Sequence, residues 1–257
     1  MGAVVGGAYA AGILNALEDL AREFSWLDFL KFMDVSSSRR GLLEGDRITD
    51  FFREKISNRL IEELILPYGA VAVDLHTGKE VCFRKGPLLD AMRASFSLPG
   101  LFTPFQRGQQ WLIDGGLVNP VPVSLCRAMG ADIVIAVNLN DGVLEKNIFR
   151  KNSKAIQDKV LDVFRSEFIS NNFPFIKIAD TSQKEKTPNM IEVMAKSIYI
   201  MQDRITRQRL LVDRPDVLIS PPLSCIGLLE FHKAKETIDA GWNSTKESLP
   251  VILEHLS

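Results

Sequence analysis

The sequence predicts an α/β domain built on a mostly parallel sheet that helices cover on both faces. Segments with strand patterns alternate with segments of helical periodicity, which is typical of this class. One strand pattern, residues 133–139, is apolar throughout, as in the buried centre of a parallel sheet. The chain has 257 residues, 46% of them hydrophobic, and shows no internal repeat or clear linker. We therefore expect residues 1–257 to form a single domain.

The first predicted elements are helices. Residues 3–22 are expected to form one helix, in which glycine and alanine recur on a face that can approach its neighbours closely. Each glycine inside a helix costs about 1 kcal/mol relative to alanine, so close packing has to compensate. Residues 46–66 have the amphipathic pattern of one or two helices that end at Pro67.

Strand patterns begin with the segment YGAVAVDLHTGKEVCFRKG, which alternates as two strands around a His-Thr-Gly turn. A short helix over residues 88–94 follows, with Pro87 at its first turn. The segment QQWLIDGG is predicted to be a strand that runs into a pair of glycines. The segment VPVSLCRAMG is predicted to be a helix that stops at Gly130, just before the strand at 133–139.

The rest of the chain is predicted to be mainly helical. A polar region, residues 140–189, contains one amphipathic helix at 156–169. Met and Ile recur at helical spacing over residues 191–212, and the segment RPDVLISPP forms a late strand before helices at 231–240 and 244–256. For the helix at 191–212, we favour a face that packs in the core over a groove that binds lipid. For the helix at 156–169, we likewise favour a core face over contact with lipid.

Composition and charge exclude several classes of protein. The formal net charge of −1 offers no field that would attract nucleic acid or an anionic membrane. Cys82, Cys126 and Cys225 are widely spaced, and we expect them to be reduced core residues of a cytoplasmic protein rather than metal ligands. No stretch reaches the roughly 20 apolar residues of a spanning helix, and the apolar start lacks the basic region of a secretory signal. Peripheral contact with a membrane remains compatible with the sequence, and no pattern indicates an oligomeric state.

Asp114 is the main candidate for a catalytic residue. It ends an apolar strand and precedes Gly115 and Gly116, which allow a sharp turn and leave the carboxylate uncrowded. In open α/β sheets, ligands and catalytic groups gather where strands end. Its position alone nevertheless favours a structural role, in which Asp114 caps the strand end through an Asx turn.

Three longer segments outweigh that structural alternative: ASFSLPGLFTPF, WLIDGGLVNPVPVSLCRAMGADIVIAVNL and the opening MGAVVGGAYAAG. Together they resemble the patatin-like phospholipase family, most closely its bacterial branch related to the neuropathy target esterases. The resemblance continues in order through RPDVLISPP and the helix from Phe231 to Gly241, and it is weakest over residues 140–190. It implies a three-layer patatin-like α/β fold.

The resemblance also implies a serine–aspartate dyad. In the family, a serine on a Gly-x-Ser-x-Gly elbow attacks an ester carbonyl, and the aspartate of the Asp-Gly-Gly motif, here Asp114, takes its proton. An upstream glycine-rich loop donates backbone N–H groups to the oxyanion. Neither a metal nor an organic cofactor is needed. The motif glycines are Gly2, Gly115 and Gly116, and no substrate-binding residue is identified.

The position of Gly2 locates the expected nucleophile. In the family, the last glycine of the elbow is followed by a small-residue helix, the arrangement found from Gly2 onward. Met1 then occupies the variable position, and we expect the serine to stand directly before it. The first strand and the glycine-rich loop are expected to lie outside this chain as well.

Other serines, histidines and charged runs have simpler explanations. No Gly-x-Ser-x-Gly occurs in residues 1–257, and the correctly spaced Gly41 and Gly45 enclose Leu43. We expect a loop at Ser36, Ser37 and Ser38, and we expect Ser95 and Ser97 to lie near the site without acting as nucleophiles. His76 is expected in a turn, and His232 and His255 on the surface of helices. The charged residues Arg39, Arg40 and 184–186 are expected to be solvated.

Two functional hypotheses follow, from different classes. The first is an N-terminally truncated serine acyl hydrolase, whose full-length form cleaves a carboxylic ester of a lipid or lysophospholipid and whose residues 1–257 alone are inactive. The alternative is a non-catalytic lipid-binding or regulatory short form, which would have to tolerate an uncovered sheet edge. A decayed gene product is a third possibility. No residue pattern indicates the headgroup, the acyl length or a preference between phospholipid, lysophospholipid and thioester.

Overall fold

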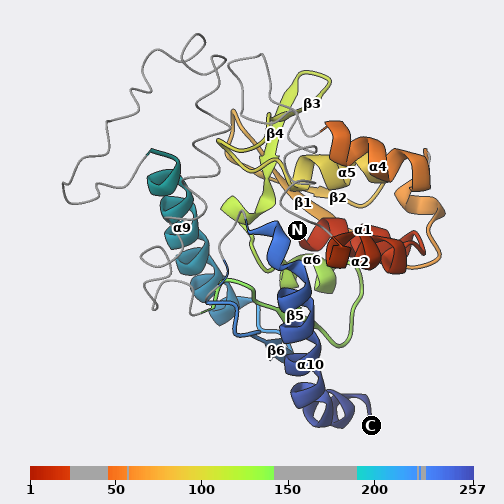
Figure 1. The fold of residues 1–257 in the computed structure, drawn as a ribbon, viewed down its shortest axis with the longest axis vertical. Helices are drawn as coiled ribbons and strands as arrows, with labels where there is room; N and C mark the ends of the chain where they lie inside the picture. The colour runs from red at the N-terminus through yellow and green to blue at the C-terminus, as the bar shows by residue number, and fades with distance from the viewer. Residues whose placement is uncertain (24–45, 57, 142–189, 225, 227–229) are drawn as a thin grey trace.

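The computed structural model of the protein describes residues 1–23, 46–56, 58–141, 190–224, 226 and 230–257. Strands of the larger sheet lie between α9 on one side and α1, α2 and α4 on the other (Figure 1). The α/β class and the presence of helices on both sides are thus confirmed. The predictions for 156–169, Ser36–Ser38, Arg39, Arg40, 184–186 and Cys225 lie outside the described residues.

The larger sheet is antiparallel, with strand order β2-β1-β4-β3. A second sheet is a parallel pair, β5 with β6. The prediction of one mostly parallel sheet was therefore wrong for the described strands. Tight turns join β1 to β2 and β3 to β4, and such short connections can only link antiparallel neighbours. The strands are β1 (Ala70–Asp74), β2 (Glu80–Phe83), β3 (Phe105–Arg107), β4 (Gln110–Asp114), β5 (Ile135–Val137) and β6 (Val217–Ile219).

The β1–β2 hairpin confirms the alternating pattern of the sequence. Ala70 pairs with Phe83 and Val73 with Glu80. Gly78 adopts φ +67° in the turn, where a residue with a side chain would be strained. The N–H groups of the two preceding turn residues donate to Asp74 Oδ1, at 3.0 and 2.9 Å. Local turn chemistry therefore sets the register of this hairpin.

Strand β5 is less buried than the sequence predicted. Ala136 is buried, but the side chains of Ile135 and Val137 are 44% and 49% exposed. Among the described strands β5 pairs only with β6, and Ile252 of α10 packs on Val217 and Ile219 of β6 rather than on β5. The apolar run therefore borders an uncovered surface within the described part of the chain, instead of forming the centre of a sheet.

The N-terminal segment forms two helices rather than the single one predicted, α1 (Gly2–Ala10) and α2 (Leu14–Glu23). Gly12 interrupts them with φ +76°. The N–H of Gly12 donates to the Tyr9 carbonyl (3.0 Å) and that of Ile13 to the Ala8 carbonyl (2.8 Å), the hydrogen-bond pair of a Schellman motif. The glycine thus ends α1 because it can adopt the left-handed conformation that this cap requires.

The remaining helices mostly follow the sequence. The predicted 231–240 and 244–256 helices are joined in one helix, α10, which contains Pro250 and runs through Gly241. The long helix α9 is confirmed, although its Met and Ile stripe is only partly buried: Ile198 is buried, whereas Met194 and Met201 are exposed. The bounds are α4 (Asp46–Ile56), η1 (Ile61–Glu63), α5 (Leu88–Ser95), η2 (Gly115–Leu117), α6 (Val123–Ala128), α9 (Met190–Val212), η3 (Phe231–Lys233) and α10 (Ala234–Leu256).

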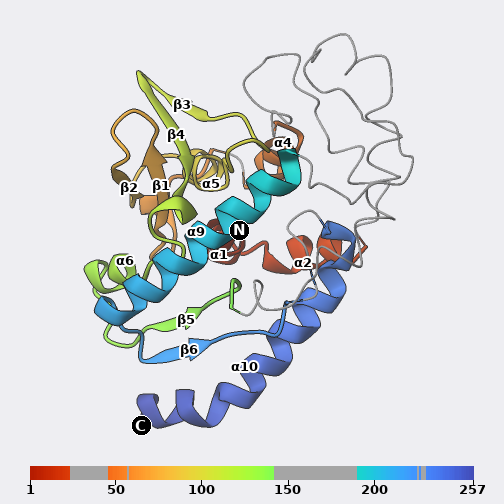
Figure 2. The same cartoon turned by 90° about the vertical axis from the view of Figure 1, so that its left-hand side faces the viewer.

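The main core lies where α1 and α5 meet the larger sheet. Ala8 of α1, Leu88 of α5 and Ala72 of β1 are all fully buried in it. A Cβ on Gly7 would lie 2.7 Å from Met92 Sδ, so the absence of a side chain lets α1 approach α5. The small face predicted for this helix is therefore its packing face. Close packing here fixes the position of the N-terminus, which lies near the centre of the fold in Figures 1 and 2.

The two described cysteines lie on the surface, although the sequence predicted that they are core residues. Cys82 and Cys126 are free thiols, as predicted, but both are exposed and not in the core. Cys82 lies on β2, an edge strand of its sheet, and its side chain is exposed whereas that of the adjacent Phe83 is buried. The prediction that these two residues are buried was wrong.

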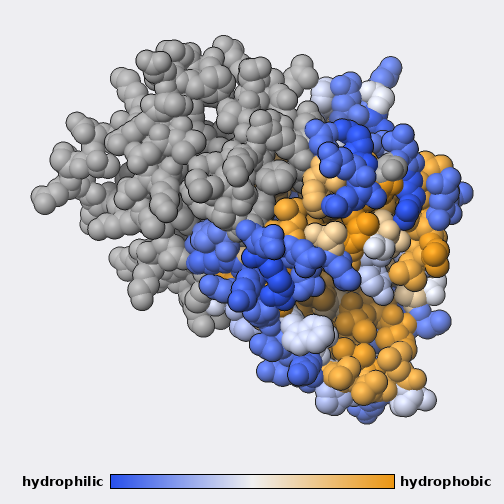
Figure 3. Space-filling model, turned by 45° about the vertical axis from the view of Figure 1, so that its right-hand side comes forward, coloured by the Kyte–Doolittle hydropathy of each residue, from blue (hydrophilic) through white to orange (hydrophobic). Residues whose placement is uncertain are grey.

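Apolar side chains also gather on one face of the molecule. Figure 3 shows a hydrophobic area over its lower part, shown in orange. Exposed apolar residues of the elements in this region include Ile135 and Val137 of β5 and Leu249 and Leu253 of α10. Among the described residues, no helix combines the length and the apolar character that crossing a bilayer requires.

Candidate active site

Asp114 lies at the end of β4, at the point where the chain turns into η2. Strand β4 is central in its sheet, and Asp114 pairs with Ala72 of β1. The backbone N–H of Asp114 donates to the Ser97 carbonyl at 2.9 Å, and its Oδ1 accepts the N–H of Gly116 at 2.6 Å. This last contact is the Asx-type cap that the sequence allowed as an alternative. The cap and a catalytic role are compatible, because Oδ2 is not used by the cap.

The two glycines after Asp114 are required by the packing around them. A Cβ on Gly115 would lie 2.2 Å from the carbonyl oxygen of Val71 on β1. A Cβ on Gly116 would lie 2.6 Å from Nε2 of Gln202 and 2.8 Å from Asp114 Oδ1. The Gly-Gly pair therefore lets the turn lie directly against β1 on one side and α9 on the other.

The surroundings of Asp114 perturb its acidity. Burial raises the pKa of the Asp114 carboxyl above its ordinary value, because the charged form loses solvation. The ammonium group of Met1 and the N–H of Gly116 act in the opposite direction and lower this pKa. The positive charge of the Met1 ammonium is thus close enough to the Asp114 carboxylate to stabilise its ionised form.

We expect Asp114→Asn to increase the free energy of unfolding at pH 7. A carboxyl whose pKa is raised by folding stabilises the protein below its unfolded pKa, and this contribution is lost as the pH rises through the folded pKa. The charged form is therefore the costly one at neutral pH, and Asn removes that cost while its Oδ1 can still accept the Gly116 N–H.

Urea unfolding of the two proteins at several pH values measures this difference. The gain should disappear as the pH falls below the ordinary Asp value of 3.8. A variant that is less stable than the wild type at pH 7 would contradict the raised pKa.

Arg93 braces the segment that holds the backbone of Asp114. One guanidinium nitrogen donates to Ser97 Oγ at 2.6 Å, and the other donates to the carbonyl and the hydroxyl of Thr103, both at 3.0 Å. Arg93 and Ser97 are buried, at 6% and 0% exposed. The arginine therefore ties the end of α5 to the chain that leads into β3, and Ser97 in turn receives the N–H of Asp114.

The other residues singled out in the sequence are spread over the molecule. Ser97 lies beside Asp114, as the resemblance implied, and its full burial supports the prediction that it is not the nucleophile. His76 occupies the β1–β2 turn, and His232 and His255 are exposed near the two ends of the η3–α10 segment. Gly2 begins α1, and a Cβ there would meet no atom within 4 Å. Its role in an elbow stays a prediction.

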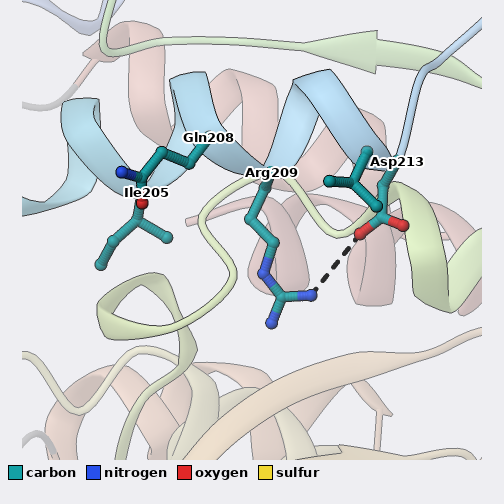
Figure 4. Close-up of a pocket in the computed structure, with 5 residues that line it drawn as sticks. Ile205, Gln208, Arg209 and Asp213 are labelled. Carbon is teal, nitrogen blue, oxygen red and sulfur yellow. Dashed lines mark hydrogen bonds and ion pairs between the residues drawn. The ribbon is translucent and has the colours of Figure 1, made fainter.

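A pocket of about 380 Å³ lies further along α9, but its lining does not include Asp114. Figure 4 shows Arg209 reaching towards Asp213 there, at 3.5 Å, and the same guanidinium contacts Glu80 Oε2 at 3.0 Å. The pocket is lined by Ile205, Gln208, Arg209, Val212 and Asp213. Because two carboxylates hold its arginine, this pocket is a poor receptor for an anionic group.

Sequence reasoning missed Arg93 and Gln202. Arg93 lies in the last turn of α5 and Ser97 lies beyond the end of that helix, so helical spacing did not indicate their contact. Gln202 gave no signal either, since it is one of several polar residues of α9 and approaches Asp114 only through the packing of that helix on η2.

Comparison with known proteins identifies the family. The profile described as patatin-like phospholipase matches residues 1–127, which include Asp114 and both glycines. An uncharacterized NTE family protein of Mycobacterium tuberculosis is 32% identical over 283 residues, which cover 94% of this chain and 79% of that protein. The chain belongs to the patatin-like phospholipase family. Family membership indicates a lipid hydrolase.

Two further relatives of this patatin-like protein agree. A second uncharacterized NTE family protein of Mycobacterium tuberculosis is 27% identical over 251 residues, covering 96% of this chain and 40% of that protein. A patatin-like phospholipase domain-containing protein of Caenorhabditis elegans is 26% identical over 257 residues, covering 96% of this chain and 18% of that protein. The names confirm the relation to neuropathy target esterases that the sequence predicted.

Proposed function

We propose that the protein is a serine acyl hydrolase that cleaves carboxylic esters of lipids or lysophospholipids, with Asp114 as the general base. The observation that carries this proposal is the meeting of three features at one point. The half-buried carboxyl of Asp114 ends a central strand, its turn is formed by two glycines that tolerate no side chain, and the ammonium group at the start of α1 lowers its pKa. Family membership supports the same reaction class.

The proposed nucleophile is a serine joined to the amino end of Met1 in a longer form of the protein. A residue bound there by a peptide bond would replace the ammonium group that now acts on Asp114. Its hydroxyl would then be near a carboxylate whose raised pKa makes it a stronger base than an ordinary aspartate. Residues 1–257 alone, which lack this hydroxyl, are expected to show no turnover.

The reaction follows from this arrangement. The serine Oγ attacks the ester carbonyl carbon and Asp114 takes the hydroxyl proton, which gives a tetrahedral oxyanion. When the bond to the alcohol breaks, Asp114 returns the proton to the leaving oxygen and an acyl-serine remains. Water then attacks the acyl-serine and gives a proton to Asp114. When the bond between the acyl carbon and serine Oγ breaks, Asp114 returns this proton to Oγ, and the carboxylic acid leaves. We further propose a cytoplasmic protein that contacts lipid through the hydrophobic face of Figure 3.

Labelling with a fluorophosphonate tests the proposal. The longer form, extended by the residues that the coding DNA specifies upstream of Met1, should be labelled on a serine directly before Met1 and should hydrolyse a short-chain chromogenic ester. Residues 1–257 should be neither labelled nor active. An in-frame stop codon close upstream, a label elsewhere, or ester turnover by residues 1–257 would overturn it. Binding of acyl chains without turnover by the longer form would instead support a non-catalytic lipid-binding protein.

A further inference from the structure

Helix α9 brings a side-chain amide to the turn that follows Asp114. This helix packs against η2, and Nε2 of Gln202 lies 2.6 Å from the position that a Gly116 Cβ would occupy. Asp114 Oδ1 lies 2.8 Å from that same position. The amide nitrogen and the carboxylate oxygen therefore both lie within 2.8 Å of one point beside Gly116, which has no side chain to fill it.

The orientation of this amide is set from the end of β5. Asn140 Nδ2 donates to Gln202 Oε1 at 3.5 Å, which turns the carbonyl end of the amide towards Asn140 and the NH₂ end towards Gly116. The backbone N–H of Asn140 in turn donates to Oδ1 of Asn138, a buried residue directly after β5. Three side-chain amides thus connect the carboxyl end of a parallel strand with the turn of Asp114.

We propose that Gln202 is a positioning residue for Asp114, whose amide, oriented by Asn140, presents its positive NH₂ end to the carboxylate and confines it above Gly116. The relevance of this role to catalysis rests on the proposed function of Asp114, whereas the geometry is independent of that function. Gly116 is essential to the arrangement, because the Cβ of any side chain there would lie 2.6 Å from Gln202 Nε2 and 2.8 Å from Asp114 Oδ1.

The amide of Gln202 would oppose the rise in the pKa of Asp114 that burial causes, a rise that, among the described groups, only the Met1 ammonium and the Gly116 N–H otherwise oppose. On β1, α5 and α9, the charged side chains include Asp74, Asp90, Arg93, Lys196, Asp203, Arg204, Arg207 and Arg209, and the Met1 ammonium lies at the start of α1. Of these groups, the Met1 ammonium lowers the pKa of Asp114. Asp74 binds the β1–β2 turn, Arg93 binds the loop after α5, Asp203 pairs with Arg207, and Arg209 pairs with Glu80 and Asp213. A dipole with its positive end towards the carboxylate favours the ionised form and so lowers the pKa of Asp114.

The test is to measure the pKa of the Asp114 carboxyl by carbon-detected NMR titration in residues 1–257. Gln202→Met keeps the size of the side chain and removes its dipole, and Gln202→Glu replaces the NH₂ by a carboxylate oxygen. The pKa should rise in the order wild type, Met variant, Glu variant, and the Glu variant should exceed the wild type by about one pH unit. Asn140→Ala, which removes only the orienting donor, should raise it as well.

Gln208→Glu is the matched control, because it introduces the same charge on the same helix at the pocket of Figure 4, away from Asp114. It should leave the pKa of Asp114 unchanged. An unchanged pKa in all three test variants, or an equal shift in the Gln208 control, would overturn the role of Gln202. This result is independent of turnover: absence of hydrolysis by the longer form would overturn the proposed function and leave the measured pKa order standing.

Discussion

Asp114→Asn is expected to lower kcat for ester hydrolysis about a thousandfold in the longer, serine-bearing form of the protein. The amide cannot take the proton of the serine hydroxyl, so the nucleophile loses its base. The substitution keeps the contact between Oδ1 and the Gly116 N–H, and the raised pKa of the native carboxyl means that the variant should unfold at higher, not lower, urea concentration at pH 7. Loss of activity with a gain in stability separates a catalytic role from a structural one.

Asp74→Asn is a suitable control for this experiment. Asp74 also ends a strand and also accepts turn N–H groups through its Oδ1. The register places Asp74 opposite Leu112, two residues before Asp114, and its carboxylate binds the β1–β2 turn and Gln110 rather than the turn after Asp114. We expect its replacement to reduce stability and to leave kcat near the wild-type value. Comparable losses of kcat in both variants would show that the effect of Asp114→Asn comes from the fold and not from proton transfer.

Gly115→Ala is expected to destabilise the fold by about 3 kcal/mol. The new Cβ would lie 2.2 Å from the carbonyl oxygen and 2.6 Å from the carbonyl carbon of Val71. Both atoms belong to the backbone of a central strand, so the clash cannot be relieved by a change of rotamer. Either β1 or the turn has to move, and the contacts between them are lost. The midpoint of thermal or urea unfolding measures the effect.

Gly241→Ala provides the opposite control. Gly241 lies inside α10, and a Cβ there would meet no atom within 4 Å. Because alanine is the better helix former, this variant should be more stable than the wild type by about 1 kcal/mol. If both variants unfolded at the wild-type midpoint, the close approach of η2 to β1 would be refuted. A loss of the same size in both would point to a general intolerance of substitution.

Part of this fold could be predicted because its causes are local. The β1–β2 hairpin follows from alternation and turn residues within 15 positions of each other, and α9 from helical periodicity. Where the sequence prediction was wrong, other local or long-range effects determined the structure. Gly12 was placed inside a single helix over residues 3–22, but its left-handed conformation ends α1. The apolar pattern of residues 133–139 indicated a central strand, whereas Ile135 and Val137 are exposed in the described structure.

The sequence by itself determined the family, the small packing face of α1 and the candidate Asp114, because each depends on a run of neighbouring residues that no other arrangement explains as well. Only the tertiary structure decided the antiparallel direction of the larger sheet, the hydrogen bond from Asp114 to Ser97, and the approach of Gln202 and Met1 to the carboxylate. These contacts join positions that are far apart in the chain. They depend on how helices pack on the sheet, which local preferences do not specify.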